Sequence, residues 1–177
     1  MYQTYLQQIN HNRYLKIVYS NIYKYSKLDN IKLLIKFNST TITKLNILYL
    51  FFLFKIFISK NGYFILLNKR SKKIIGMRFI LQHNLMYKFL TFLKINFLNQ
   101  PEVQNNIKLT SFDLSNNYTF YISNILNYYL EKNLENRYYK NILNQFDMTI
   151  HFVFKQNTNM YDHMFYLNYF GFVFFLN

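Results

Sequence analysis

Residues 31–37 alternate between apolar side chains and a second set of positions that includes Lys32 and Lys36. Successive side chains of an extended chain point to opposite faces, so this alternation predicts a strand with both lysines on one face. Residues 148–154 alternate with the same period and predict another strand. Each strand would bury one face and leave the other face to polar groups.

Three shorter apolar runs, at 63–67, 77–81 and 118–122, are rich in β-branched and aromatic residues and also predict strands. A short basic connection joins the first two runs, which suits a hairpin. Arg78 lies between two apolar neighbours, so its side chain is expected to point away from the core. With the two lysines, it would give the sheet a basic face.

Helical spacing of apolar residues predicts two helices in the middle of the chain. Thr43 is the expected N-cap of the first helix, and Asn84 is the expected N-cap of the second. The apolar stripe of the first helix contains Leu45, Leu48, Tyr49, Phe52 and Ile56. The stripe of the second helix contains Met86, Phe89, Leu90, Leu93 and Phe97.

Outside these elements, a polar helix is expected within residues 1–25 and a last helix from about Asn159. Residues 126–143 fit either a helix or an irregular arm. No repeat or linker divides the chain, so residues 1–177 are expected to form a single domain. The order of elements predicts an α+β fold, with helices packed on one face of an antiparallel-rich mixed sheet and the other face open.

Composition adds a strong charge imbalance. The 177 residues include 21 Lys and Arg against 7 Asp and Glu, a net charge of +14, which favours polyanionic partners such as nucleic acid or anionic lipid. The absence of cysteine excludes disulfides, Cys-ligated zinc and a thiol nucleophile. Alanine and tryptophan are also absent, while residues with AT-rich codons are abundant, which indicates an AT-rich organelle genome.

The sequence contains no motif that predicts an enzyme or a cofactor. It has no Gly-rich phosphate loop and no Ser-His-Asp signature. Glu131 and Glu135 could share a helix face, but a solvated face is a better interpretation than an acid–base pair. Four histidines lack the spacing of metal ligands and are expected to be structural: His11, His83, His151 and His163.

A small organelle-encoded subunit of a respiratory membrane complex is the alternative from another class. Its support is the aromatic content and the apolar run 47–58, which Lys55 interrupts. That run has about twelve residues, whereas a spanning helix needs about 20. The sequence therefore predicts no membrane span, and residues 1–30 lack the features of a secretory signal or a cleavable presequence.

Residues 69–73 form a basic cluster at the expected hairpin tip. Clustered cations repel one another unless a polyanion neutralises them, so the cluster fits phosphate contacts as well as a solvated turn. Tyr63, Phe64 and Phe79 are the aromatic residues around it, and we expect them to belong to the core. No base stacking is predicted from this segment.

Two motifs in the block from Ile75 to Thr119 point to a known family. The first motif is matched at Ile75, Gly76, Leu81, Met86, Tyr87, Phe89 and Leu90, with Arg78 in place of a lysine. The second motif follows without an insertion, and its residues 111–113 and 117–119 read Ser-Phe-Asp and Asn-Tyr-Thr. This block resembles the large-subunit ribosomal protein five family, the central-protuberance proteins that hold 5S rRNA. A weaker likeness extends the resemblance over residues 27–171.

The resemblance implies a structural constituent of the mitochondrial large ribosomal subunit that supports translation. It would be encoded in the organelle and located in the matrix, and its open sheet face would bind 5S rRNA or, failing that, large-subunit rRNA. Neighbouring mitoribosomal proteins and the small-subunit head would be further partners. The basic connection is shorter than the family's loop toward the P-site tRNA, so tRNA contact stays open.

This sequence also departs from the family at the second motif, where Leu114-Ser115-Asn116 replace a Gly-Arg-Gly sequence and an Arg-to-phosphate fork is lost. Asn116 and Asn117 are expected to shape the turn before the following strand. The expected RNA-binding residues are Lys32, Lys36, Asn38, Lys69, Arg70, Lys72, Lys73 and Arg78.

Overall fold

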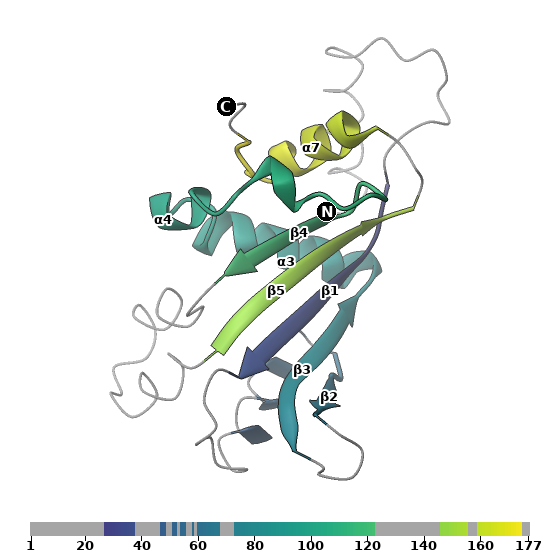
Figure 1. Ribbon diagram of the computed structural model, residues 1–177, viewed down its shortest axis with the longest axis vertical. Helices are drawn as coiled ribbons and strands as arrows, with labels where there is room; N and C mark the ends of the chain where they lie inside the picture. Colours follow the sequence, from purple (N-terminus) through teal and green to yellow (C-terminus); the bar gives the residue numbers. More distant parts are fainter. Residues whose placement is uncertain are drawn as a thin grey trace.

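The computed structural model describes residues 27–37, 47–48, 51–52, 54–55, 58, 60–67, 73–122, 146–155 and 159–174. Its centre is an open five-stranded sheet with the strand order β2-β3-β1-β5-β4 (Figure 1). All pairings between these strands are antiparallel. The strands are β1 (Leu28–Phe37), β2 (Tyr63–Leu66), β3 (Ile74–Leu81), β4 (Tyr118–Ile122) and β5 (Phe146–Phe154).

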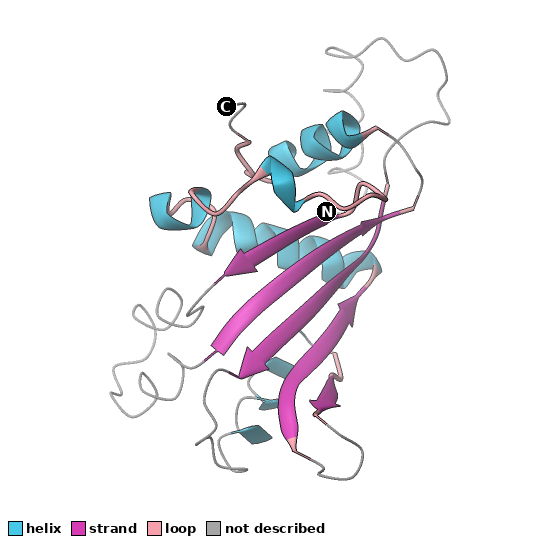
Figure 2. Ribbon diagram, viewed as in Figure 1, coloured by secondary structure: helices cyan, strands magenta, loops and turns pink. Residues whose placement is uncertain are grey.

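The longest described helix, α3 (His83–Asn96), passes behind the strands in the view of Figure 1. A second helix, α7 (Met160–Tyr169), follows β5, and both helices bury side chains in the same core as the sheet. Two short helices, α4 (Pro101–Gln104) and η1 (Leu109–Ser111), lead from α3 to β4 (Figure 2). The predicted α+β class, with an open sheet, is confirmed.

Strict alternation along β1 and β5 builds the core. Every second residue of β5 from Phe146 to Phe154 is buried, and so are Ile31, Leu33 and Ile35 of β1. On α3 the predicted stripe is buried as expected, including Met86 and Leu93. Burial of so many large apolar side chains on one face explains why the helices lie on that face of the sheet.

Two local predictions are wrong. Gln82, in an extended conformation, caps α3, and Asn84 is already inside the helix, because the chain turns into α3 directly after β3 ends. In the helical residues between 47 and 58, Leu48 and Phe52 of the predicted stripe are 48% and 56% exposed. The face with Phe54 and Ile58 is buried instead, because Phe54 packs on Phe79 of β3.

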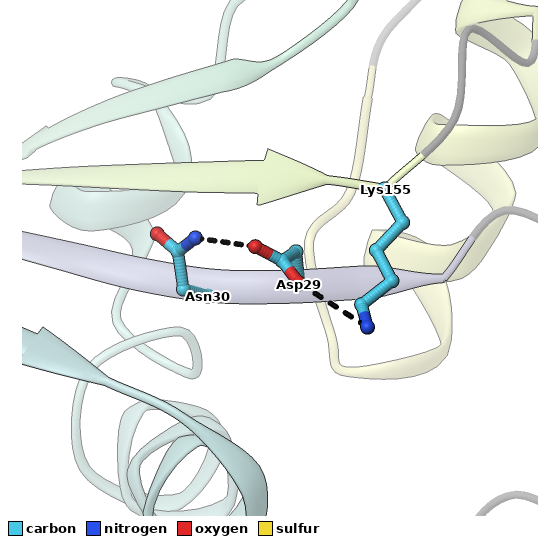
Figure 3. A network of polar contacts seen from close by, with 3 residues as sticks. All are labelled: Asp29, Asn30 and Lys155. Atoms are coloured by element: carbon cyan, nitrogen blue, oxygen red, sulfur yellow. Dashed lines mark hydrogen bonds and ion pairs between the residues drawn. The ribbon is translucent and has the colours of Figure 1, made fainter.

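Polar contacts tie the start of β1 to the end of β5 (Figure 3). Asn30 Nδ2 donates a hydrogen bond to Asp29 Oδ2 at 2.7 Å, and Lys155 Nζ lies 3.4 Å from Asp29 Oδ1. The backbone N–H of Lys155 also donates to the carbonyl of Lys27 at 2.8 Å. Since the charged side chains are largely exposed, the ion pair contributes little, and the backbone bond carries more of this junction.

The predicted helix in residues 1–25 and the ambiguous segment 126–143 lie outside the described residues, and so does the expected cap Thr43. The last predicted helix begins where expected, since Asn159 is the N-cap of α7.

Candidate nucleic-acid interface

The open face of the sheet carries three cations on two neighbouring strands. Lys32 and Lys36 lie on β1, and Arg78 lies on β3, opposite Leu34 in the register. Arg78 is therefore diagonal to both lysines, and diagonal neighbours on adjacent strands are about 7–8 Å apart. The prediction that these three side chains share the face opposite the core is confirmed by their position between buried neighbours.

Few carboxylates offset these cations. Asp147 lies opposite Lys36 on β5, and Asp113 approaches the face from the turn before β4. Within the described part of the chain, none of the three cations forms an ion pair with a carboxylate. Like charges held this close repel one another, so the face favours an anionic ligand.

A hollow of about 420 Å³ opens on the same face. Its lining comes from all five strands and from the turn before β4, so it crosses the sheet from one edge to the other. Its lining residues are Lys32, Leu33, Leu34, Ile65, Arg78, Asp113, Asn117, Thr119, His151 and Val153. The cations lie toward β3, while the carboxylate of Asp113 and the uncharged polar groups lie toward β4 and β5.

His151 is the central polar group of this hollow. It lies between Lys32 and Thr119 in the register, and its Nδ1 is 3.0 Å from Thr119 Oγ1. Burial lowers the pKa of His151 below its ordinary value of 6.5; Lys32 and Arg78 lower it further, and Asp113 opposes them. At pH 7 the ring is therefore mainly neutral and can donate one hydrogen bond and accept another.

The turn of residues 113–117 forms one wall of the hollow. Asp113 Oδ1 accepts hydrogen bonds from the backbone N–H groups of Ser115 at 2.9 Å and Asn117 at 2.8 Å. Asn117 Nδ2 donates to Asp113 Oδ2 at 3.1 Å, and Asn117 Oδ1 accepts from the N–H of Phe154 at 3.1 Å. Asn116 adopts a φ of 59°, a conformation that asparagine tolerates well. The prediction that Asn116 and Asn117 shape this turn is confirmed.

Replacing Asp113 by alanine is expected to lower the free energy of unfolding by about 1–2 kcal/mol, because two backbone N–H groups and an amide lose their acceptor. Urea denaturation measures this loss. Asp113→Asn is the control, because it keeps one acceptor oxygen and removes the charge. Equal unfolding midpoints for Asp113→Ala and the wild type would contradict the role given to this turn.

The same carboxylate makes stability depend on acid pH. Burial raises the pKa of Asp113, but hydrogen bonds from Asn117 and Ser115 and the nearby His151 together lower it more. The pKa of Asp113 therefore lies below its ordinary value of 3.8. Between the lowered pKa and 3.8 the unfolded state binds more protons than the folded state. The contribution of Asp113 is thus complete above 3.8 and is lost as the pH falls through the lowered pKa. Asp113→Asn is expected to remove this part of the acid dependence.

Four of the expected RNA-binding residues lie outside the described residues: Asn38, Lys69, Arg70 and Lys72. Lys73 is exposed and immediately precedes β3, where its carbonyl accepts the N–H of Leu67 at 2.8 Å. That bond closes the β2–β3 hairpin, as the sequence predicted. Among the described residues, Lys73 is therefore the one member of the basic cluster. The pairing of β1 with β3 brings Lys32, Lys36 and Arg78 together.

Sequence reasoning missed three groups on this face. Tyr63 was expected in the core but is 68% exposed beside Arg78. Of the other two aromatic residues expected there, Phe64 is 36% exposed and Phe79 is fully buried. Tyr121 is 47% exposed at the opposite edge of the sheet. The alternation of 118–122 and 148–154 could have placed Tyr121 and His151 on the polar face. Only strand pairing shows that Tyr121 lies beside Thr149 and that His151 lies beside Lys32.

His163 is buried, stacks on Phe154 with ring centroids 3.8 Å apart, and its Nδ1 donates to the carbonyl of Asn116 at 2.6 Å, which fits the structural role expected of it. Among the described residues, no group of three or more His, Asp or Glu side chains could hold a metal ion. No described helix is long and apolar enough to cross a membrane.

Comparison with known proteins adds no assignment. Neither a model of a known protein family nor a curated protein matches this sequence.

Proposed function

We propose that this chain is a structural constituent of the mitochondrial large ribosomal subunit that binds rRNA through the open face of its sheet. One observation carries the proposal: Lys32, Lys36 and Arg78 lie together on a face that no described helix covers. Phosphate contacts by cations at fixed positions orient a protein on RNA without reading its sequence. The net charge of +14 adds a long-range attraction for the same partner.

The two motifs behind the family resemblance support the proposal by meeting at one place. The first motif supplies Arg78 from β3, and the second supplies Asp113, Asn117 and Thr119 from the turn and β4. All four line the hollow on the open face, although they come from distant segments of the chain. The RNA would be 5S rRNA or a helix of the large-subunit rRNA in the central protuberance.

The triple variant Lys32→Gln, Lys36→Gln, Arg78→Gln tests the binding surface. Losing three phosphate contacts is expected to weaken binding of a 5S or large-subunit rRNA transcript at least about tenfold at 0.15 M salt. It should also flatten the plot of log affinity against log salt concentration by about two units. Filter binding over a salt series measures both quantities.

The matched control removes three other cations, Lys55→Gln, Lys88→Gln and Lys94→Gln. These lysines are exposed on helical segments whose buried faces pack on the other side of the sheet. The control is expected to lose much less affinity for the same change in charge. Equal losses in both variants would mean that only the net charge matters, and the open face would not be the interface.

The cellular part of the proposal is tested by sedimentation of an organelle lysate while this chain is tracked. Co-migration with the large ribosomal subunit, with crosslinks from the open face to rRNA, is the expected result. Migration with a membrane complex and without RNA adducts would contradict the proposal and favour the respiratory-subunit alternative.

A further inference from the structure

Two exposed tyrosines frame the open face at its opposite edges. Tyr63 lies on the edge strand β2 and Tyr121 on the edge strand β4, and their side chains are 68% and 47% exposed. Both tyrosines lie on the same face of the sheet as the hollow. Tyr63 pairs with Arg78, and Tyr121 is two residues from Thr119, and both of these partners line the hollow.

The two rings belong to one row of side chains that crosses the whole sheet. Tyr63 pairs with Arg78, Arg78 with Leu34, Leu34 with Thr149, and Thr149 with Tyr121. Four strand spacings of about 4.8 Å separate the ends of the row, so the tyrosines lie about 19 Å apart. Between the tyrosines, Arg78 and Leu34 of this row line the hollow.

We propose that this face binds unpaired nucleotides, with Tyr63 and Tyr121 each stacking on a base and the sugar–phosphate chain crossing the hollow between them. The inference rests on the proposed function and specifies the form of RNA that the face selects. Aromatic rings on an open sheet stack on splayed bases, whereas the bases of a duplex are already stacked inside it.

The distribution of charge fits a single strand that crosses in this way. Arg78 belongs to the row between the two rings, and Lys32 and Lys36 lie on the rows to either side of it. Lys32 and Arg78 also line the hollow, where phosphates would pass. The polar groups near the β4 edge are the uncharged His151, Thr119 and Asn117 and the carboxylate of Asp113. They suit hydrogen bonds to the edges of an unpaired base rather than to phosphates.

Tyr121 lies beside a carboxylate of the neighbouring strand, Asp147. Burial and then this carboxylate raise the pKa of the Tyr121 phenol. The residue is 47% exposed, which leaves part of the ring open to a stacking base.

The experiment compares a mixed-sequence 12-nucleotide RNA, single-stranded or annealed to its complement, with the full-length chain. We expect the single strand to bind at least fivefold more tightly than the duplex. Tyr63→Ala and Tyr121→Ala are each expected to weaken single-strand binding by roughly 5- to 150-fold, the range for loss of one stacked base. Duplex affinity and the salt dependence should change little, because the phosphate contacts remain.

Tyr63→Phe and Tyr121→Phe keep the rings and are expected to retain most of the affinity. Tyr161→Ala is the matched control, because this tyrosine is 69% exposed on α7 and is not on the open face. Photocrosslinking with 5-iodouridine in the single strand should map to Tyr63 and Tyr121, since the halogenated base reacts with a ring stacked on it.

Two results would overturn the inference in distinguishable ways. If the duplex binds as tightly as the single strand and the alanine variants bind normally, the face docks on RNA by its backbone alone and only the stacking is refuted. If neither RNA binds the wild-type chain, the proposed function is refuted as well. Far-UV circular dichroism of each variant ensures that a loss of binding is not a loss of fold.

Discussion

The variant Phe172→Ala is expected to lose about 3–5 kcal/mol of unfolding free energy, the range for a phenylalanine truncated in a core. Phe172 is fully buried after the end of α7. Its ring meets those of Phe120 and Phe152 edge-on, with centroids 5.3 Å apart in both cases, and that of Tyr118 at 6.0 Å. Phe172 therefore packs the segment after α7 against β4 and β5. Truncating its side chain would leave a cavity that the neighbouring rigid rings cannot fill.

Urea denaturation followed by circular dichroism measures this effect. Val173→Ala is the control, because the neighbouring side chain is 37% exposed and its truncation should cost less than about 1 kcal/mol. If Phe172→Ala unfolds at the same urea concentration as the wild type, the C-terminal segment does not pack on the sheet as described.

Gly76→Ala is expected to cost about 3 kcal/mol, at the upper end of the effect of overpacking. Gly76 pairs with Lys36 across the β1–β3 ladder, and a Cβ atom there would overlap the carbonyl oxygen of Ile35. The obstacle is backbone, so no side-chain rotation relieves it and β3 must move away from β1. The two strands carry Arg78 and the lysines, so RNA affinity is expected to fall with stability.

Thermal unfolding and filter binding together measure both effects. Thr149→Ala, on the open face of β5, is the control and should change stability by less than about 1 kcal/mol, since its neighbours are not forced apart. Unchanged stability of Gly76→Ala would show that the β1–β3 ladder tolerates a side chain at this position. The family resemblance matched Gly76 at this position, and the close approach of Ile35 gives a physical reason for a glycine there.

Amphipathic patterns gave the elements of this fold correctly where the period was clear. The alternation in 31–37 and 148–154 predicted β1 and β5, and helical spacing predicted the buried stripe of α3. Prediction failed in the helical residues between 47 and 58, where nearly every position is apolar and the period marks no single face. The contact with Phe79 then decides which side is buried.

The candidate site was predictable in part. Lys32, Lys36 and Arg78 could be assigned to polar faces because each lies between apolar neighbours in a strand. The role of Tyr63 could not be predicted, since an aromatic residue beside a strand end fits a core as well as a surface. Its exposure follows from its pairing with Arg78, which places the ring on the open face of the edge strand β2.

The sequence by itself determined which side chains share a face, because side chains alternate with a period of two along any strand. It also determined the local turn in which Asp113 accepts hydrogen bonds from residues close in the chain. Only the tertiary structure decided that β1 lies between β3 and β5, and so that Lys32 lies beside His151. Strand order and register depend on pairing between distant segments, which the burial of the whole apolar face selects and no local pattern specifies.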